Sequence, residues 1–285
     1  MDPDSIAQAA QLACLLEVSA DKPGNVTWDK AFWDARYVDF MASAVAIGPA
    51  LRDAPSRAVG ETILHAVRDT RRFVRTNTNL GMVLLLAPLA KAAGLPHPQG
   101  LQGAVGEVLR ALSIEDARHA FAAIRFAAPG GLGDSDVYDV RGAEVNGTLL
   151  EAMRAAQDRD TVAREYATDF QITFGIGHAA LLRFLEEGHP FSDAVVQTAL
   201  TILSRVPDTL IARKEGLATA QAVSEEAAHV LAVGGAFSER GREAMEAFDR
   251  SIRDDQHRLN PGTTADLTTA SIFALLVEGH GSVQV

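Results

Sequence analysis

Residues 80–93 read LGMVLLLAPLAKAA, and the composition of this stretch predicts an apolar helix. Thr78 or Asn79, directly before it, is a suitable N-cap because its side-chain oxygen can accept from a free N–H of the first turn. Pro88 and Lys91 interrupt the apolar run, so it does not reach membrane-spanning length. The stretch therefore predicts a helix of a globular protein.

The same pattern continues on both sides, with helical periodicity broken by short polar segments. No convincing run of alternating β-branched residues predicts a strand. No repeat or linker divides the chain, so residues 1–285 are predicted to form an all-α fold, a single compact domain of about a dozen helices. The other helices are expected near residues 4–19, 38–52, 55–74, 99–111, 114–127, 147–158, 161–175, 177–187, 191–205, 217–233, 238–256 and 265–279.

Composition narrows the class of function. The chain has 285 residues, is 47% hydrophobic and carries a formal net charge of −11. That charge argues against nucleic acid and anionic membranes as partners, so an anionic substrate would need locally placed cations. Cys14 is the only cysteine, which excludes an internal disulfide. The acidic start MDPD lacks the basic region of a signal peptide, so a cytoplasmic location is expected.

Residues 130–141 read GGLGDSDVYDVR, between two predicted helices. Asp134, Asp136 and Asp139 repel one another unless a cation disperses their charge, and Mg²⁺ is usually held by carboxylates together with substrate phosphates. The spacing is not that of an EF-hand, because position 6 of such a loop would be Asp139 where glycine belongs. A metal–phosphate site and a solvated turn both fit these residues.

Lys22, Gly24 and Asn25 form a second polar break, just after the helix that carries Glu17. Lysine is scarce in the chain, so Lys22 beside a Pro-Gly turn is a candidate phosphate contact, and Glu17 a candidate carboxylate ligand. An ordinary turn lysine and a solvated acid at a helix end are the alternatives.

Asn77, Thr78 and Asn79 form a third break, at the start of the apolar helix. Two amides and a hydroxyl at a helix start can bind a nucleotide base or sugar hydroxyls, and the free N–H groups attract anions. Simple capping needs only one of the three side chains.

The fourth break is residues 261–266, PGTTAD. Thr263 and Thr264 offer an anion-binding helix start, and Asp266 could hold a metal or orient Thr263. Thr263 and Asp266 also fit a capping box, which is the structural alternative. Three flanking residues could supply further charge, namely Asp208, Arg213 and Lys214.

Taken together, these breaks resemble the triphosphoribosyl-dephospho-CoA synthase family over essentially the whole chain. The resemblance rests on Glu17 followed by KPGNV (22–26), on NTNLG (77–81), on GGLG (130–133) with DVR (139–141), and on LNPGTTADL (259–267). It implies an all-helical cytosolic enzyme that moves a triphosphoribosyl group from ATP to the ribose 2′-hydroxyl of 3′-dephospho-CoA and releases adenine.

The chain departs from citrate-lyase-type members of the family at two places. They carry a His-Lys pair after Asn-Thr and a His-Arg-Gly motif, whereas this chain has Asn79-Leu80 and ARKEG (212–216). It is closer to a divergent branch from archaea and from methylotrophs that use tetrahydromethanopterin and methanofuran-type cofactors. For that branch the resemblance implies a role in building a one-carbon carrier cofactor, with a different acceptor.

The leading hypothesis is a Mg²⁺-dependent transferase with ATP as substrate and an anionic small-molecule acceptor; a homodimer is the expected assembly. Cleaving a glycosidic C–N bond requires negative charge near an oxocarbenium-like centre and a proton donor to the base. The candidate catalytic residues are Asp136, Asp139 and Asp266. The candidate metal ligands are Glu17, Asp134, Asp136, Asp139 and Asp266. The candidate substrate- and phosphate-binding residues are Lys22, Gly24, Asn25, Asn77, Thr78, Asn79, Gly131, Arg141, Arg213, Lys214, Thr263 and Thr264.

Two other functions use the same residues. A phosphotransferase acting on a small cofactor precursor needs the same Mg²⁺ and phosphate contacts. A helical nucleotide-binding protein without turnover needs only the pocket.

Overall fold

A computed structural model describes residues 1–96, 98–128 and 145–279. Throughout these ranges the regular structure is helical and no strand is present, which confirms the all-α prediction. The first half contains α1 (Pro3–Ser19), α2 (Tyr37–Ala46), α3 (Gly48–Arg52), α4 (Val59–Arg71), α5 (Leu80–Ala93), α6 (Gly100–Arg110) and α7 (Ile114–Ala127). None of the helices in the described ranges is long and apolar enough to cross a membrane.

The second half contains several short helices and ends in a largely buried one. Its elements are α8 (Leu149–Ala156), α9 (Thr161–Ala167), the π-helix η1 (Thr173–His178), α10 (Ala179–Glu186), α11 (Phe191–Arg205), α12 (Thr209–Glu215), α13 (Leu217–Ala232), the 3-10 turn η2 (Gly235–Phe237), α14 (Glu239–Ile252) and α15 (Gly262–Val277).

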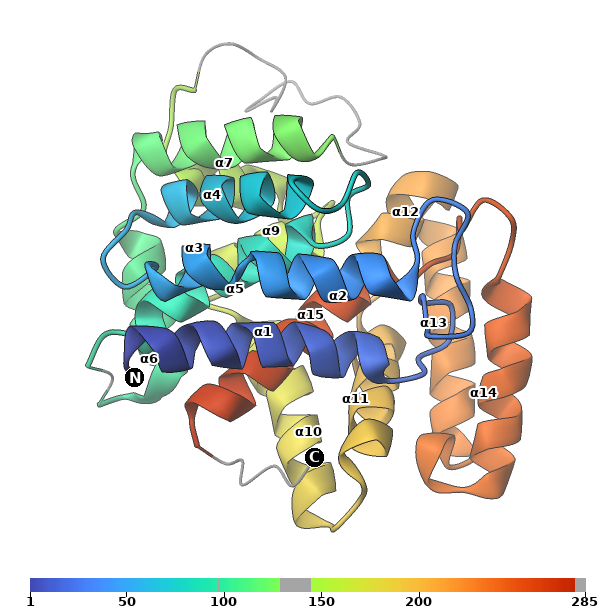
Figure 1. The fold of residues 1–285 in the computed structure, drawn as a ribbon. Helices are drawn as coiled ribbons and strands as arrows, with labels where there is room; N and C mark the ends of the chain where they lie inside the picture. The colour runs from blue at the N-terminus through green and yellow to red at the C-terminus, as the bar shows by residue number, and fades with distance from the viewer. Residues whose placement is uncertain (97, 129–144, 280–285) are drawn as a thin grey trace.

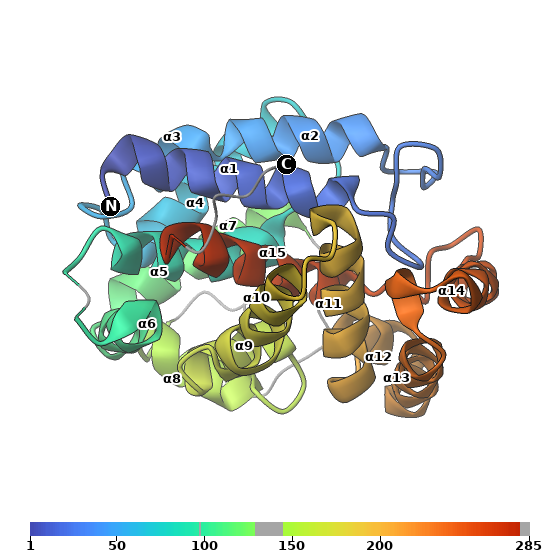
Figure 2. The ribbon, with the colours of Figure 1, turned by 90° about the horizontal axis from the view of Figure 1, so that it is seen from below.

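Helix α15 runs through the middle of the molecule and contacts α1, α5, α11 and η1 (Figures 1 and 2). It is apolar or small on all sides, from Leu267 to Leu275, as expected for a helix that other helices surround. The predicted apolar helix α5 packs directly against it. One hydrophobic cluster connects these helices, so both ends of α5 and α15 are held in fixed positions.

Several helix ends differ from the sequence prediction, each for a local reason. The expected helix 38–52 is two helices, because Pro49 cannot donate a backbone hydrogen bond that would continue α2 into α3. The expected helix 55–74 is shorter and starts at Val59. Helix α12 was not expected at all; Asp208 caps it by accepting from two of its first N–H groups.

The expected helix 161–175 stops at Ala167, because Asp169 and Phe170 have positive φ. The buried carboxylate of Glu165 accepts from the N–H groups of Ile172 and Thr173, both at 2.8 Å, and so begins the next helical turn. Burial raises the pKa of Glu165 to about 7, against these hydrogen bonds. A helical periodicity does not reveal such hydrogen bonds between a side chain and the backbone of the next turn.

The packing of α4 on α7 depends on one glycine. Asp116 caps its own helix by accepting from Ser113 N at 2.8 Å, and its other oxygen accepts from Gly60 N at 2.8 Å. A Cβ atom at Gly60 would overlap the backbone of Asp116. Relieving this overlap would require the backbones of α4 and α7 to move apart, so no side chain fits at Gly60.

We expect Gly60→Ala to destabilise the protein by about 3 kcal/mol, the upper end of the usual cost of overpacking, because the overlap is with backbone. The free energy of unfolding in urea measures the effect. Gly175→Ala is the matched control, since a Cβ at Gly175 meets nothing within 4 Å. Equal stabilities for the two variants would contradict the assigned α4–α7 contact.

Candidate active site

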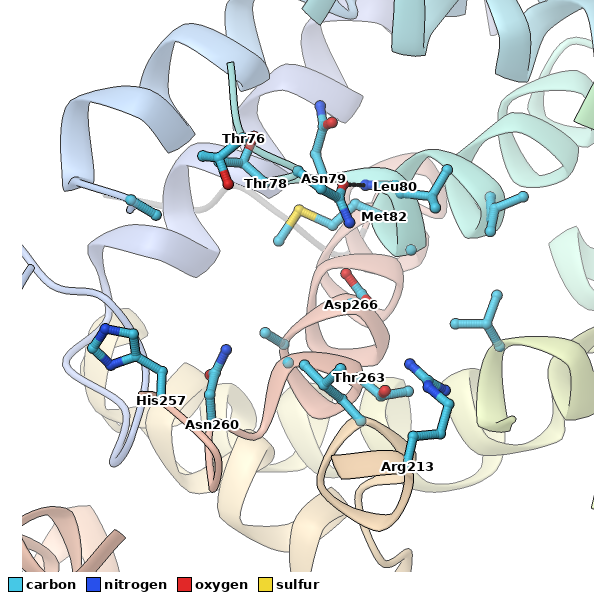
Figure 3. Close-up of a pocket in the computed structure, with 18 of the residues that line it drawn as sticks. Thr76, Thr78, Asn79, Leu80, Met82, Arg213, His257, Asn260, Thr263 and Asp266 are labelled. Atoms are coloured by element: carbon cyan, nitrogen blue, oxygen red, sulfur yellow. Dashed lines mark hydrogen bonds between the residues drawn. The ribbon is translucent and has the colours of Figure 1, made fainter. Parts of the chain in front are cut away.

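A cavity of about 590 Å³ lies where the ends of several helices meet. Its lining comes from segments far apart in the chain: the turn after α1, the starts of α5 and α15, and the end of α12 (Figure 3). Many of the residues predicted from sequence line it, namely Glu17, Lys22, Asn25, Asn77, Thr78, Asn79, Arg213, Lys214, Thr263 and Asp266. The polar breaks in the described part of the chain thus share one pocket.

Asp266 stands in the middle of this cavity (Figure 3). It lies in the second turn of α15, so it does not take part in the capping box considered above. Its side chain is partly exposed to the cavity, and within the described ranges its carboxylate makes no hydrogen bond or ion pair. A Cβ atom at Gly81, in the first turn of α5, would overlap this carboxylate.

The pKa of Asp266 is raised well above the usual range for a carboxyl group. Removal from bulk water is the main cause, and the charges of Glu17, Asp208 and Asp160 act in the same direction. Arg213 opposes them more weakly. A carboxyl group whose surroundings favour the protonated form, and which has no partner among the described residues, therefore faces the cavity.

Lys22 and Glu17 form a buried ion pair at the edge of the cavity. Lys22 Nζ lies 3.0 Å from Glu17 Oε1 and also donates to the carbonyl oxygens of Glu17 and of Ala20, the latter at 3.0 Å. Both side chains are about as inaccessible as core residues, with 2–3% of their surface exposed. The three protons of the ammonium group thus have internal acceptors, which favours a structural role over the predicted phosphate contact.

Asp208 holds the start of α15 in place. One of its oxygens accepts from the N–H of Thr264 at 2.7 Å and from the Thr264 hydroxyl at 2.9 Å, while the other caps α12. Burial raises the pKa of Asp208, and these hydrogen bonds oppose the shift. Both polar groups of Thr264 are therefore already used, whereas Thr263 lines the cavity and accepts from Thr209. The predicted phosphate role fits Thr263 better than Thr264.

Two cations from the end of α12 border the cavity. Arg213 donates to Asp160 at 2.8 Å, and Lys214 donates to the backbone oxygen of His257 at 3.0 Å. Burial lowers the pKa of Lys214, against the attraction of Asp208 and Asp34. Each side chain retains N–H groups beyond these bonds, so both can contact an anion.

The amides around the cavity are oriented by hydrogen bonds to other polar groups. Asn25 donates to Asn260 at 2.8 Å, Asn79 donates to the Thr70 hydroxyl at 3.0 Å, and Asn77 accepts from Leu80 N at 3.1 Å. Asn77 therefore caps α5, although Asn79 occupies the N-cap position. The Thr78 hydroxyl is 2.5 Å from that of Ser43.

Not every predicted residue reaches the cavity. Gly24 has a φ of +75°, donates to Asp249 at 2.7 Å and packs against Ile252 and Pro261, which explains a glycine there without a ligand. Gly131, Asp134, Asp136, Asp139 and Arg141 lie outside the described residues. In the ranges that are described, no group of three or more metal-ligating side chains stands together.

The structure adds site residues that the sequence did not single out. Arg159 and Asp160 come from the turn before α9, and Phe32, Trp33, Asp34 and His257 come from two loops. An apolar wall comes from α5, α7, α8 and α9, including Leu84, Phe121, Ile124 and Met153. Of these residues, Phe32 and Trp33 belong to a stretch rich in aromatic residues (28–40), which is visible in the sequence; the place of the others depends on which helices become neighbours.

Comparison with known proteins points to one enzyme family. The family model for ATP:dephospho-CoA triphosphoribosyl transferase matches residues 3–284. A Pseudomonas fluorescens protein described as a probable 2-(5''-triphosphoribosyl)-3'-dephosphocoenzyme-A synthase is 27% identical over 237 residues, which are 83% of this chain and 72% of that protein. The synthase of the same name from Klebsiella pneumoniae is 33% identical over 91 residues, 32% of this chain and 30% of that protein.

A solved structure is similar as well. The crystal structure of an Archaeoglobus fulgidus protein assigned as a triphosphoribosyl-dephospho-CoA synthase superposes with a TM-score of 0.64 at 28% identity. The match covers 85% of this chain and 100% of the archaeal one. The chain belongs to the family of ATP:dephospho-CoA triphosphoribosyl transferases, which are ATP-dependent transferases.

Proposed function

We propose that this protein transfers the triphosphoribosyl group of ATP to a hydroxyl of an anionic acceptor and releases adenine, with Asp266 as the proton donor to the departing base. The observation that carries the proposal is the carboxyl group of Asp266, which has a raised pKa and stands inside the shared cavity with no partner among the described residues. The family's acceptor, 3′-dephospho-CoA, is the first candidate.

In the proposed reaction the bond between the ribose C1′ and the adenine nitrogen breaks, and a bond forms between C1′ and the acceptor oxygen. The developing oxocarbenium ion needs negative charge nearby, and we assign this role to Glu17, because its pair with Lys22 opposes the rise in pKa that burial causes. Asp266 gives its proton to adenine as the base leaves. The proton lost by the acceptor hydroxyl restores the carboxyl group, so the net transfer is from the acceptor to adenine.

The same cavity offers separate surroundings for the parts of ATP. Arg213 and Lys214 carry the positive charge that a triphosphate requires. The wall formed by α5, α7, α8 and α9 offers an apolar surface for a base, and the amides of Asn77 and Asn79 can bond to its edge.

We also propose that the reaction requires Mg²⁺, which would supply charge neutralisation on the triphosphate. In the described part of the chain, Asp34 and Asp266 are the cavity carboxylates that make no hydrogen bond or ion pair. Asp266 would fit as one ligand, but its raised pKa favours the proton-donor role. Asp134, Asp136 and Asp139 stay the predicted metal ligands. The acceptor in a one-carbon carrier cofactor pathway likewise stays part of the proposal.

The test is an incubation of the protein with ATP, Mg²⁺ and 3′-dephospho-CoA, with separation of the products. We expect free adenine in equal amount to the modified acceptor. ADP in place of adenine would show phosphoryl transfer and contradict the proposal. If dephospho-CoA gives no product, the same assay with precursor alcohols of tetrahydromethanopterin and methanofuran tests the alternative acceptors, and absence of adenine with all of them would reject the function.

A further inference from the structure

The loop between α1 and α2 carries an exposed tryptophan at the cavity. Trp33 lines the cavity although 79% of its surface is exposed, which places the indole at the mouth. A large apolar ring left in water at a binding cavity is typical of a ligand-contacting surface. Trp28, on the same loop, is equally exposed but is not part of the cavity lining.

The backbone that carries Trp33 is held firmly. Trp33 N donates to His257 Nε2 at 3.2 Å, and Phe32 N donates to Ala35 O at 2.8 Å. The ring of Phe32 stacks on that of His257, with centroids 3.7 Å apart and planes 19° from parallel. Figure 1 shows this loop beside the connection from α14 to α15. The indole is therefore presented from an anchored loop, and ordering it on binding costs little.

The proposed reaction needs room for two nucleotides, and this inference rests on that proposed function. The base of ATP must reach Asp266, which stands inside the cavity, because that base receives the proton. The base of a nucleotide acceptor must then lie elsewhere. Trp33 is at the mouth, where its exposed aromatic ring is open to a second base.

We propose that the indole of Trp33 is the stacking platform for the nucleobase of the acceptor. Aromatic stacking tolerates any base, so this contact sets the class of acceptor, a nucleotide, and not the identity of its base. It also separates the two adenine nucleotides: the donor's base lies within reach of Asp266, and the acceptor's base lies outside it.

Fluorescence tests this contact without turnover. The chain has two tryptophans, so Trp28→Phe leaves Trp33 as the only indole. We expect 3′-dephospho-CoA to quench its emission with a saturable titration, and 4′-phosphopantetheine, which has no base, to leave it unchanged. Quenching by ATP and not by dephospho-CoA would assign the platform to the donor and overturn the proposal, as would no quenching by either.

Kinetics give the second test. Trp33→Ala should raise KM for dephospho-CoA by about 5- to 150-fold, the usual loss for one base–aromatic stack, and leave KM for ATP unchanged. Trp33→Phe should recover part of the loss, and Trp28→Ala is the matched control with no effect. Adenine release with an unaltered KM in Trp33→Ala would reject the platform and keep the proposed function. Quenching by dephospho-CoA without adenine release would keep the platform and reject the function.

Discussion

Asp266→Asn is expected to lower kcat by about 10²- to 10⁴-fold, the usual contribution of a general acid, with little change in KM for ATP. Asparagine has nearly the same shape but cannot give a proton to the leaving adenine. Because the carboxylate makes no hydrogen bond within the described ranges, the substitution should leave the free energy of unfolding close to that of the parent. Adenine release under saturating ATP and acceptor is the measurement.

The pH dependence of kcat separates this role from a general loss of activity. A proton donor works only while protonated, so kcat of the parent should hold at low pH and fall as pH rises through the raised pKa of Asp266. The variant should lack this fall. If Asp266 were a metal ligand instead, Asp266→Asn would raise the Mg²⁺ concentration needed for half-maximal activity, which we expect to stay the same.

Gly81 offers a companion variant. The added Cβ of Gly81→Ala meets the far end of the Asp266 side chain, which can rotate away, so the fold should survive while the carboxylate is displaced. We expect reduced kcat without loss of stability. A fully active Gly81→Ala protein would contradict the close approach of the Asp266 carboxylate to the first turn of α5.

The largest effect on stability is expected for Lys22→Met. Removing one member of a buried ion pair leaves the other charge uncompensated, which costs about 3–5 kcal/mol. For a chain of this size, that corresponds to a fall in Tm on the order of 10 °C. Burial already raises the pKa of Glu17, and loss of Lys22, which lowers it, should raise that pKa further. Since a raised pKa favours the folded state only while the group is protonated, the variant should lose more stability as pH rises.

The double variant Glu17→Gln with Lys22→Met is the control, because it removes both charges. It should recover much of the lost stability, although not the activity that depends on the charge of Glu17. If Lys22 were instead a phosphate contact, Lys22→Met would raise KM for ATP and leave Tm unchanged. The two outcomes are opposite, so one thermal scan and one ATP titration decide between them.

Local sequence signals were sufficient for much of the helical pattern. Helices α7 and α11 have the expected bounds, and Ser113 and Asp116 form a capping box at the start of α7, because caps and apolar periodicity act within a few residues. The split of α2 from α3 at Pro49 and the end of α9 near Asp169 were missed. Those ends depend on how neighbouring turns are stabilised, as Glu165 shows.

The candidate site, like the helices, was predicted only in part from the sequence. Sequence alone selected the polar breaks, because Gly, Asn, Thr and Asp at helix starts are typical of ligand-binding turns. The sequence made Lys22 a candidate phosphate contact, but folding places Lys22 beside Glu17 and two backbone oxygens. It offered Asp208 and Thr264 as separate charge and phosphate contacts, but folding bonds them to each other across 56 residues.

The amino-acid sequence by itself determined that this protein is all-helical, where most helices lie, and which breaks carry polar groups, since these properties depend on short-range propensity and capping. The tertiary structure alone decided which of those groups are available to a ligand. Among the described residues Asp266 has no partner and a raised pKa, Lys22 is fully paired, and Trp33 stands at the cavity mouth. Burial and pairing arise only when distant helices pack together, and they set the chemistry of each side chain.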